Sequence, residues 1–272
     1  VEQQLRVDDA DADGRDVVIE RNRAQLITRP HLLERQRQGN ERTGNRRRAG
    51  ATIGLDDVAV DPDRPLAERG QVYLTGTQAL VRLPMAQIRR DRAFGLNTAG
   101  FVTGYRGSPL GGYDQQLHAA RKHLEQYNVK FQPGVNEELG ATAVWGSQQL
   151  DLFPEKNKFD GVFGMWYGKG PGLDRSIDAL RHAHLIGTSK TGGALAVVGD
   201  DHGMKSSDVP AACETMFMDL QFPVLYPSNV QEVLDLGLHG WAMSRFSGGW
   251  VGFKIVADAV DASSSVYVDP AR

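Results

Sequence analysis

The sequence predicts an α/β fold in which a parallel β-sheet carries helices on both faces. From Val72 onward, short segments that are apolar throughout alternate with amphipathic segments of helical length. Strands without polar positions are typical of parallel sheets whose two faces are both covered. The composition agrees with this class, because 40% hydrophobic and 24% charged residues are ordinary for a globular protein.

The first elements of this domain follow from local patterns. A helix is predicted over 75–95, with Pro84 as the position of a kink. The apolar run TAGFVTGY predicts a strand over 98–105. Helices are then predicted over 113–127, where apolar residues recur at three- and four-residue spacing, and over 135–150.

The later elements alternate in the same way, with apolar runs read as strands and the amphipathic stretches between them read as helices. In chain order they are a strand over 159–167, a helix over 172–187, strands over 193–199 and 222–228, a helix over 229–245 and a strand over 248–256. The whole domain is expected to cover residues 71–262, and residues 263–272 are expected to begin a linker to another domain.

The first 52 residues differ from this pattern. They contain eleven arginines but no Phe, Trp, Tyr or Lys. We predict a disordered extension, or translated upstream sequence, because the chain does not begin with Met. An arginine-rich arm that binds nucleic acid is disfavoured by the absence of stacking aromatics and by the many acids. Residues 53–70 carry turn signals and are interpreted as a linker.

Composition also limits the function. The net charge of −3 gives no general attraction to nucleic acid or to a membrane. The single cysteine, Cys213, excludes an internal disulfide and a multi-cysteine metal site, which suits a reducing compartment. No apolar run approaches the roughly 20 residues of a membrane span. We therefore expect the protein in the cytoplasm.

Three glycine-containing loops follow predicted strands, at 104–112, 167–176 and 199–208. Loops at the carboxyl ends of parallel strands lie on one edge of the sheet, where α/β proteins bind ligands. None of the three is a P-loop or a GxGxxG fingerprint. Each loop alone is more typical of a tight turn, but the three together favour a binding site.

The segment PGVNEELGATAVWG places two acids, Glu137 and Glu138, at the head of an apolar helix. The surrounding residues predict that a carboxylate is buried there, which is costly unless the group is paired or protonated. One interpretation is a functional carboxyl group. The other is that the two acids favour the helix N-terminus electrostatically.

Five segments together resemble a known family: GYRGSPLGGYD, PGVNEELGATAVWG, FDGVFGMWYGKGPG, GDDHGMKSS and WAMSRFSGGWVGFK. They are similar to the N-terminal domain of single-chain indolepyruvate:ferredoxin oxidoreductases, members of the 2-oxoacid:ferredoxin oxidoreductase family. The resemblance runs from about Val72 to Val260 and leaves out residues 1–52. It implies that the α/β domain is of the type that binds the pyrimidine half of thiamine diphosphate.

The resemblance also implies roles for particular residues. Glu137 would be the catalytic carboxyl group that hydrogen-bonds the cofactor pyrimidine, although a shift of one residue in the match would exchange it with Glu138. Ser108 would face the substrate carboxylate and the cofactor. Arg106 would pair with an anionic substrate, unless it makes a structural salt bridge instead.

Two further loops would complete this site. Gly168, Lys169 and Gly170 would line the pyrimidine pocket, with a solvated lysine as the alternative for Lys169. The substrate side would include His202, Lys205 and Ser206. His202 would assist proton transfer, or would serve only as a hydrogen-bonding loop residue. No metal ligand is predicted.

The implied reaction is the oxidative decarboxylation of an aryl 2-oxoacid, typically indolepyruvate, with the acyl group passed to coenzyme A and the electrons to ferredoxin. The Gly-Asp-Gly…Asn motif that would hold Mg²⁺ and the cofactor diphosphate is not found, and no cysteine cluster for iron–sulfur centres occurs. We therefore expect these groups in a missing domain or partner subunit, within an oligomer that binds neither nucleic acid nor membrane. The alternatives are another thiamine-dependent enzyme, such as a different 2-oxoacid oxidoreductase or a transketolase-like protein, and a non-catalytic docking subunit.

Overall fold

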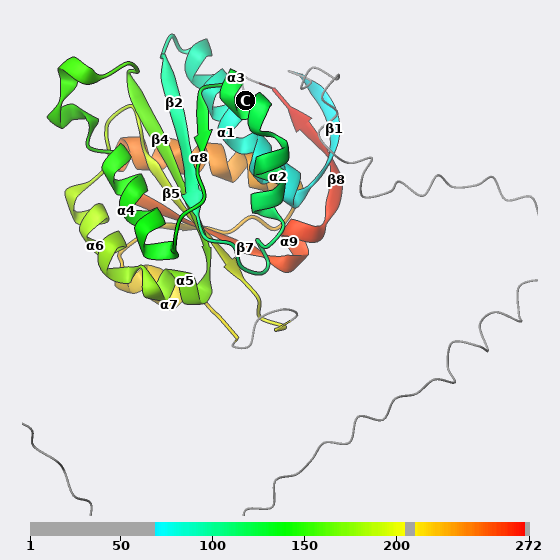
Figure 1. Cartoon of the computed structure of the whole chain (residues 1–272). Coiled ribbons are helices and arrows are strands. Elements are labelled where there is room, and N and C mark those ends of the chain that lie inside the picture. The colour runs from blue at the N-terminus through cyan, green and yellow to red at the C-terminus, as the bar shows by residue number, and fades with distance from the viewer. Residues whose placement is uncertain (1–68, 205–209, 270–272) are drawn as a thin grey trace, which may run out of the picture. The chain divides into compact units, whose positions relative to one another are not determined.

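The computed structural model describes residues 69–204 and 210–269 (Figure 1). The predictions for residues 1–52, for nearly all of the segment 53–70 and for Lys205 and Ser206 therefore lie outside the described residues.

The centre of the domain is a six-stranded sheet in which all neighbouring strands are parallel. In spatial order its strands are β3 (Val129–Phe131), β2 (Thr98–Gly104), β4 (Gly161–Lys169), β5 (Ala194–Asp200), β7 (Trp250–Val256) and β6 (Val224–Leu225). The four inner strands are nearly all buried, as their uninterrupted apolar sequences predict.

Helices cover both faces of this sheet, which confirms the predicted α/β class (Figure 1). One face packs against α1 (Gly76–Ala93), α2 (Tyr113–Ala119), α3 (Arg121–Gln126) and α8 (Val230–Ser247). The other face packs against α4 (Glu137–Ser147), α5 (Gly170–Arg175), α6 (Ile177–Ile186) and α7 (Glu214–Asp219). A hydrophobic core lies on each face of the sheet, and successive residues of β4 point into different cores. Met165 lies in the core on the first face and Trp166 in the core on the second.

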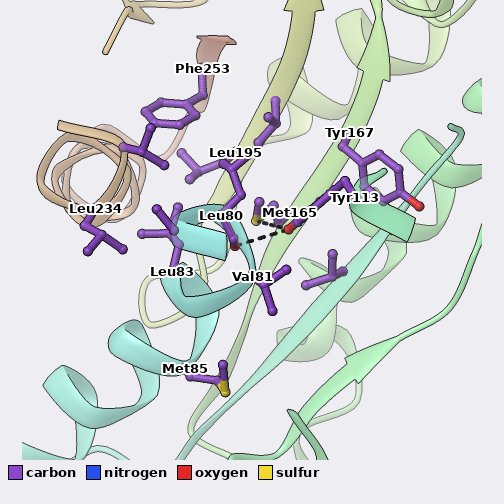
Figure 2. Close-up of a cluster of buried hydrophobic side chains, with 14 of the residues drawn as sticks. Leu80, Val81, Leu83, Met85, Tyr113, Met165, Tyr167, Leu195, Leu234 and Phe253 are labelled. Carbon is purple, nitrogen blue, oxygen red and sulfur yellow. Dashed lines mark hydrogen bonds between the residues drawn. The ribbon is translucent and has the colours of Figure 1, made fainter. Parts of the chain in front are cut away.

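The larger core lies between α1, α8 and the sheet (Figure 2). Leu80 and Leu83 of α1 are fully buried, and the hydroxyl of Tyr113 donates a hydrogen bond of 3.3 Å to the carbonyl of Leu80. A Cβ placed on Gly237 of α8 would overlap a methyl carbon of Leu83, so only glycine allows this close approach of the two helices.

Helix α1 begins where the sequence predicts. The side chain of Thr75 accepts a hydrogen bond of 3.1 Å from the backbone N–H of Gln78, and the Gln78 side chain accepts one of 2.9 Å from the Thr75 N–H. This reciprocal capping box satisfies two backbone donors that a helix N-terminus otherwise leaves open. The helix continues through Pro84 to Ala93.

Several predicted elements differ in the structure. The helix predicted over 113–127 is interrupted at Ala120, and the one over 172–187 is interrupted at Ser176. The strand expected over 222–228 is reduced to the two residues of β6. Short elements were also missed, among them β3, α7, α9 (Ala257–Asp261) and two 3₁₀ turns at Leu150–Leu152 and Pro154–Lys156.

Ser263–Val268, where the sequence predicts the start of a linker, form the strand β8 instead. This strand pairs antiparallel with β1 (Gly70–Thr75), along the full length of both. Leu74 and Val266 from the pair are buried in the larger core. The sequence does not indicate β8, because the strand begins with three exposed serines and has only one buried side chain, that of Val266.

No helix in the described parts of the chain combines the length and the hydropathy that a membrane span requires.

Candidate functional site

The loops that follow β2, β4 and β5 lie on one edge of the sheet, as predicted. The parallel register sets Gly104 beside Tyr167 and Lys169 beside Gly199 at the ends of these strands. The backbone N–H of Tyr105 donates a hydrogen bond of 3.0 Å to the carbonyl of Tyr167. This carboxyl edge is the place where open α/β sheets bind ligands.

The first two loops touch each other. A Cβ placed on Gly107 would lie 2.8 Å from the Cδ of Lys169, so the lysine stem passes directly over the loop backbone. Pro109 in turn packs against the end of β5, because a Cβ on Gly199 would lie 2.7 Å from its Cδ. Ser108, between these contacts, is half-buried, and Arg106 is exposed.

Glu137 is the first residue of α4. The side chain of Asn136 caps this helix by accepting a hydrogen bond of 2.8 Å from the N–H of Leu139. The carbonyl of Glu137 accepts a hydrogen bond of 2.9 Å from the indole N–H of Trp166, which fixes the helix start against β4. The Glu137 side chain then reaches α5, where a Cβ on Gly172 would lie 2.7 Å from its Cγ.

Glu137 is half-buried rather than buried, and its neighbour Glu138 is exposed. The expectation of a buried carboxylate is therefore wrong for this chain by itself. The reason is that α4 begins at the open carboxyl edge of the sheet, where the Glu137 side chain packs against Gly172 of α5 and stays partly exposed.

Four polar side chains at this edge have no hydrogen-bond or ion-pair partner among the described residues. Within residues 69–204 and 210–269, the carboxylate of Glu137 and the side chains of Ser108, Arg106 and Lys169 make no hydrogen bond or ion pair. Polar groups that fold into a half-buried position usually find partners. Their availability together at one edge suits a site for a polar ligand.

Gly168 and Gly170, predicted to line a cofactor pocket, have a packing role. A Cβ on Gly168 would lie 2.9 Å from the Trp166 ring, and one on Gly170 would lie 2.5 Å from the Cβ of Ala211. Packing against Trp166 and Ala211 is therefore enough to explain why these positions are glycine. The contact of Gly168 and Gly170 with a ligand stays a prediction.

His202 belongs to a charged cluster at the ends of β5 and β7. Its Nε2 lies 3.3 Å from the ammonium of Lys254, which forms ion pairs with Asp200 at 3.2 Å and with Glu214. Lys254 also lies over the Tyr226 ring, 4.9 Å from its centroid. The structure thus brings His202 to Lys254 and gives no contact between His202 and Glu137.

The cluster contains one cation, Lys254, which pairs with two carboxylates, those of Asp200 and Glu214. The side chains of Lys254 and Asp200 are 1% and 0% exposed, so each charge needs the other. Burial opposes the charge on Lys254, but hydrogen bonds to Glu214 and Asp200 outweigh it, and the pKa of the ammonium lies above its ordinary value. Sequence reasoning missed this group, although a lysine inside the apolar run WVGFKIV was a usable signal.

Asp200, Cys213 and Glu214 bring ligand-type atoms within 4.8 Å of one another, a spacing that a metal ion requires. Lys254 nevertheless lies on both carboxylates and supplies the positive charge. Burial also raises the pKa of the Cys213 thiol, with Asp200 adding to the effect, so the thiol stays protonated. These residues do not suit a cation.

No protein-family model and no curated protein matches the chain. Among solved structures, the chain is similar to "2-oxoglutarate:ferredoxin oxidoreductase from Magnetococcus marinus with 2-oxoglutarate, coenzyme A and succinyl-CoA bound", with a TM-score of 0.56 and 16% sequence identity. The similarity covers 74% of this chain and 32% of that chain, so the chain spans about a third of that protein. The likeness is one of fold: this chain folds like one part of a 2-oxoacid:ferredoxin oxidoreductase.

Proposed function

We propose that the chain is the pyrimidine-binding part of a thiamine diphosphate-dependent 2-oxoacid:ferredoxin oxidoreductase. The observation that carries the proposal is Glu137, a half-buried carboxylate at the carboxyl edge of the sheet that has no hydrogen-bond or ion-pair partner among residues 69–204 and 210–269. The fold likeness to a 2-oxoglutarate:ferredoxin oxidoreductase supports it.

The residues present fit a pyrimidine ring. Gly172 leaves room for the Glu137 side chain, which a Cβ there would crowd at 2.7 Å. Glu137 would hold the ring through a hydrogen bond to one of its nitrogens. Ser108 and Lys169, from the neighbouring loops, supply a hydroxyl and an ammonium for the substrate or the ring. When bound, the cofactor would supply the electron sink for decarboxylation of the 2-oxoacid.

The other half of the site would come from a separate domain or subunit. Val135 and Leu139 flank Glu137 and are 81% and 53% exposed. Large apolar side chains that are exposed beside a polar site are typical of a surface that another domain covers. Such a domain would bring Mg²⁺ and the diphosphate-binding residues, would lead electrons through iron–sulfur clusters to ferredoxin, and would bury Glu137.

The substrate that we propose is an aryl 2-oxoacid such as indolepyruvate, with Arg106 pairing with its carboxylate and coenzyme A accepting the acyl group. A different 2-oxoacid is the second candidate, because the structure that this fold resembles contains 2-oxoglutarate. Ferredoxin reduction by the complete enzyme with indolepyruvate, phenylpyruvate and 2-oxoglutarate distinguishes the two. A preference for 2-oxoglutarate would contradict the aryl assignment and leave the reaction class intact.

The reaction class is tested by Glu137→Gln in the complete enzyme. The glutamine keeps the size and hydrogen-bonding capacity of the side chain but cannot transfer a proton, so turnover should fall by about 100-fold or more. Glu138→Gln is the matched control, because Glu138 is the exposed neighbour and should retain near-normal turnover. Circular dichroism should show both variants folded. Half of the wild-type turnover in Glu137→Gln would contradict the proposal, whereas loss in Glu138→Gln alone would shift the role by one residue.

A further inference from the structure

The loop between β2 and α2, residues 105–112, is held at both ends by Tyr167 of β4. At the entry to the loop, the carbonyl of Tyr167 accepts a hydrogen bond of 3.0 Å from the N–H of Tyr105. At the exit, the hydroxyl of Tyr167 donates a hydrogen bond to Oδ1 of Asp114, in the first turn of α2. The backbone and the side chain of one residue therefore fix the span of the loop that carries Arg106 and Ser108.

The hydrogen bond between Tyr167 and Asp114 has a rigid donor. Tyr167 is fully buried in the larger core, where the ring of Tyr113 meets its ring edge-on at a centroid distance of 5.1 Å (Figure 2). Asp114 is half-buried, and among residues 69–204 and 210–269 its carboxylate has no other hydrogen-bond or ion-pair partner. The position of Asp114, and with it the exit of the loop, therefore depends on the Tyr167 hydroxyl.

Between these two anchors the loop packs through apolar contacts. Leu110 is fully buried in the larger core, and a Cβ on Gly199 would lie 2.7 Å from the Cδ of Pro109. Apolar contacts are not directional, so they hold the loop down without fixing the direction of a hydroxyl group. The side chain of Ser108 hydrogen-bonds none of the described residues, and its direction therefore follows from the path of the loop backbone.

Arg106 lies near the same hydrogen bond. Burial and the carboxylate of Asp114 raise the pKa of Tyr167, whereas the positive charge of Arg106 lowers it. Because the effect of a charge weakens with distance, Arg106 must lie in the neighbourhood of the Tyr167 hydroxyl. The hydrogen bond between Tyr167 and Asp114 is thus placed to influence both loop residues that would meet the substrate carboxylate.

We propose that Asp114 is a positioning residue for the 2-oxoacid substrate. Through Tyr167 it holds the loop 105–112 so that Ser108 and Arg106 face the substrate carboxylate, and it touches neither substrate nor cofactor itself. This inference rests on the proposed function and adds to it a control of substrate affinity. Because the hydrogen bond acts on the substrate loop and not on Glu137, its loss should raise the KM for the 2-oxoacid more than it lowers kcat.

The experiment compares Tyr167→Phe, which removes only the hydroxyl, with Tyr113→Phe as the matched control. The hydroxyl of Tyr113 lies in the same core but donates to the carbonyl of Leu80 in α1, at 3.3 Å, and not to the loop. In the full chain, amide hydrogen exchange of residues 106–108 should become about five-fold faster in Tyr167→Phe, because one hydrogen bond that closes the loop is lost. It should stay unchanged in Tyr113→Phe, although both variants lose a buried hydrogen bond.

The second measurement is steady-state ferredoxin reduction by the complete enzyme, with the 2-oxoacid that it prefers among the three named above. Tyr167→Phe and Asp114→Ala should each raise the KM for that acid by about five-fold, with kcat within about two-fold and the affinity for thiamine diphosphate unchanged. Asp114→Asn keeps an acceptor oxygen and should retain most of the substrate affinity. The double variant Tyr167→Phe/Asp114→Ala should resemble either single variant, because both changes remove the same hydrogen bond.

Three results would overturn the positioning role of Asp114. They are an unchanged KM in Tyr167→Phe, an equal rise of KM in Tyr113→Phe, and additive effects in the double variant. Faster exchange of the loop without a change in KM would also overturn it, because the hydrogen bond would then serve the fold alone. A wild-type enzyme that reduces no ferredoxin with any of the three acids would instead contradict the proposed function, and this inference with it.

Discussion

At the scale of single residues, Gly172 positions the Glu137 carboxylate. A Cβ at Gly172 would lie 2.7 Å from Cγ and 3.1 Å from Oε1 of Glu137, so Gly172→Ala must displace that carboxylate. We expect the turnover of the complete enzyme to fall on the order of 10-fold, because small misplacements of a reacting group are costly. Stability should hardly change, since Ala favours a helix more than Gly does.

Gly146→Ala is the control for this variant. Gly146 lies on α4, the helix of Glu137, and a Cβ there would meet no atom within 4 Å. It should leave both turnover and thermal stability close to those of the wild type. If Gly172→Ala kept full turnover, the Glu137 carboxylate would not need its present position.

Glu137, Gly172 and Lys254 differ in how well the sequence alone predicts their surroundings. Glu137 is recognisable because an acid heads an apolar helix, which is a local pattern. Its contact with Gly172 is not recognisable, because α4 and α5 meet only when both pack on the sheet. Lys254 is an intermediate case: its place in an apolar strand signals a buried charge, but its partners Asp200 and Glu214 come from distant segments.

At the scale of elements, His184 links α6 to β7. Its Nδ1 accepts a hydrogen bond of 3.0 Å from the backbone N–H of Trp250, so protonation of that nitrogen breaks the link. Burial holds the pKa of His184 below its ordinary value of 6.5. The folded state therefore binds this proton less readily than the unfolded state. The stabilisation is complete above about pH 6.5 and is lost as the pH falls through the lowered pKa.

His184→Gln tests this link, because a glutamine oxygen can accept the Trp250 N–H but does not titrate. We expect urea unfolding free energies of the wild type to fall between about pH 7 and pH 5, and those of His184→Gln to fall less. Parallel profiles for the two proteins would show that His184 has the same pKa in the folded and unfolded states, and would contradict the proposed link.

Element lengths explain which parts of the fold were predictable. The inner strands β2, β4, β5 and β7 and the helix α8 are long enough for their patterns to be unambiguous. Breaks such as Ala120 interrupt a helical pattern without changing its spacing, so the two pieces were read as one. The strand β3 has three residues, and its pairing with β2 comes from the tertiary structure.

At the scale of the whole molecule, the parallel order of the strands brings loops that are far apart in the sequence to one edge. That consequence of the fold class was predictable, and the structure confirms it for the loops after β2, β4 and β5. The half-buried state of Glu137 and the exposure of Val135 and Leu139 were not predictable. A sequence pattern records that a residue becomes buried, but it does not say whether its own chain or a partner covers it.

We propose that Glu137 holds the pyrimidine ring of thiamine diphosphate. The most direct test is an experimental structure of this chain together with its diphosphate-binding part and the bound cofactor. We expect a Glu137 carboxylate oxygen within about 2.6–3.2 Å of a pyrimidine ring nitrogen, with Val135 and Leu139 covered by the partner. A ring that is bound elsewhere, or a Glu137 side chain that still faces solvent in the complete assembly, would contradict it.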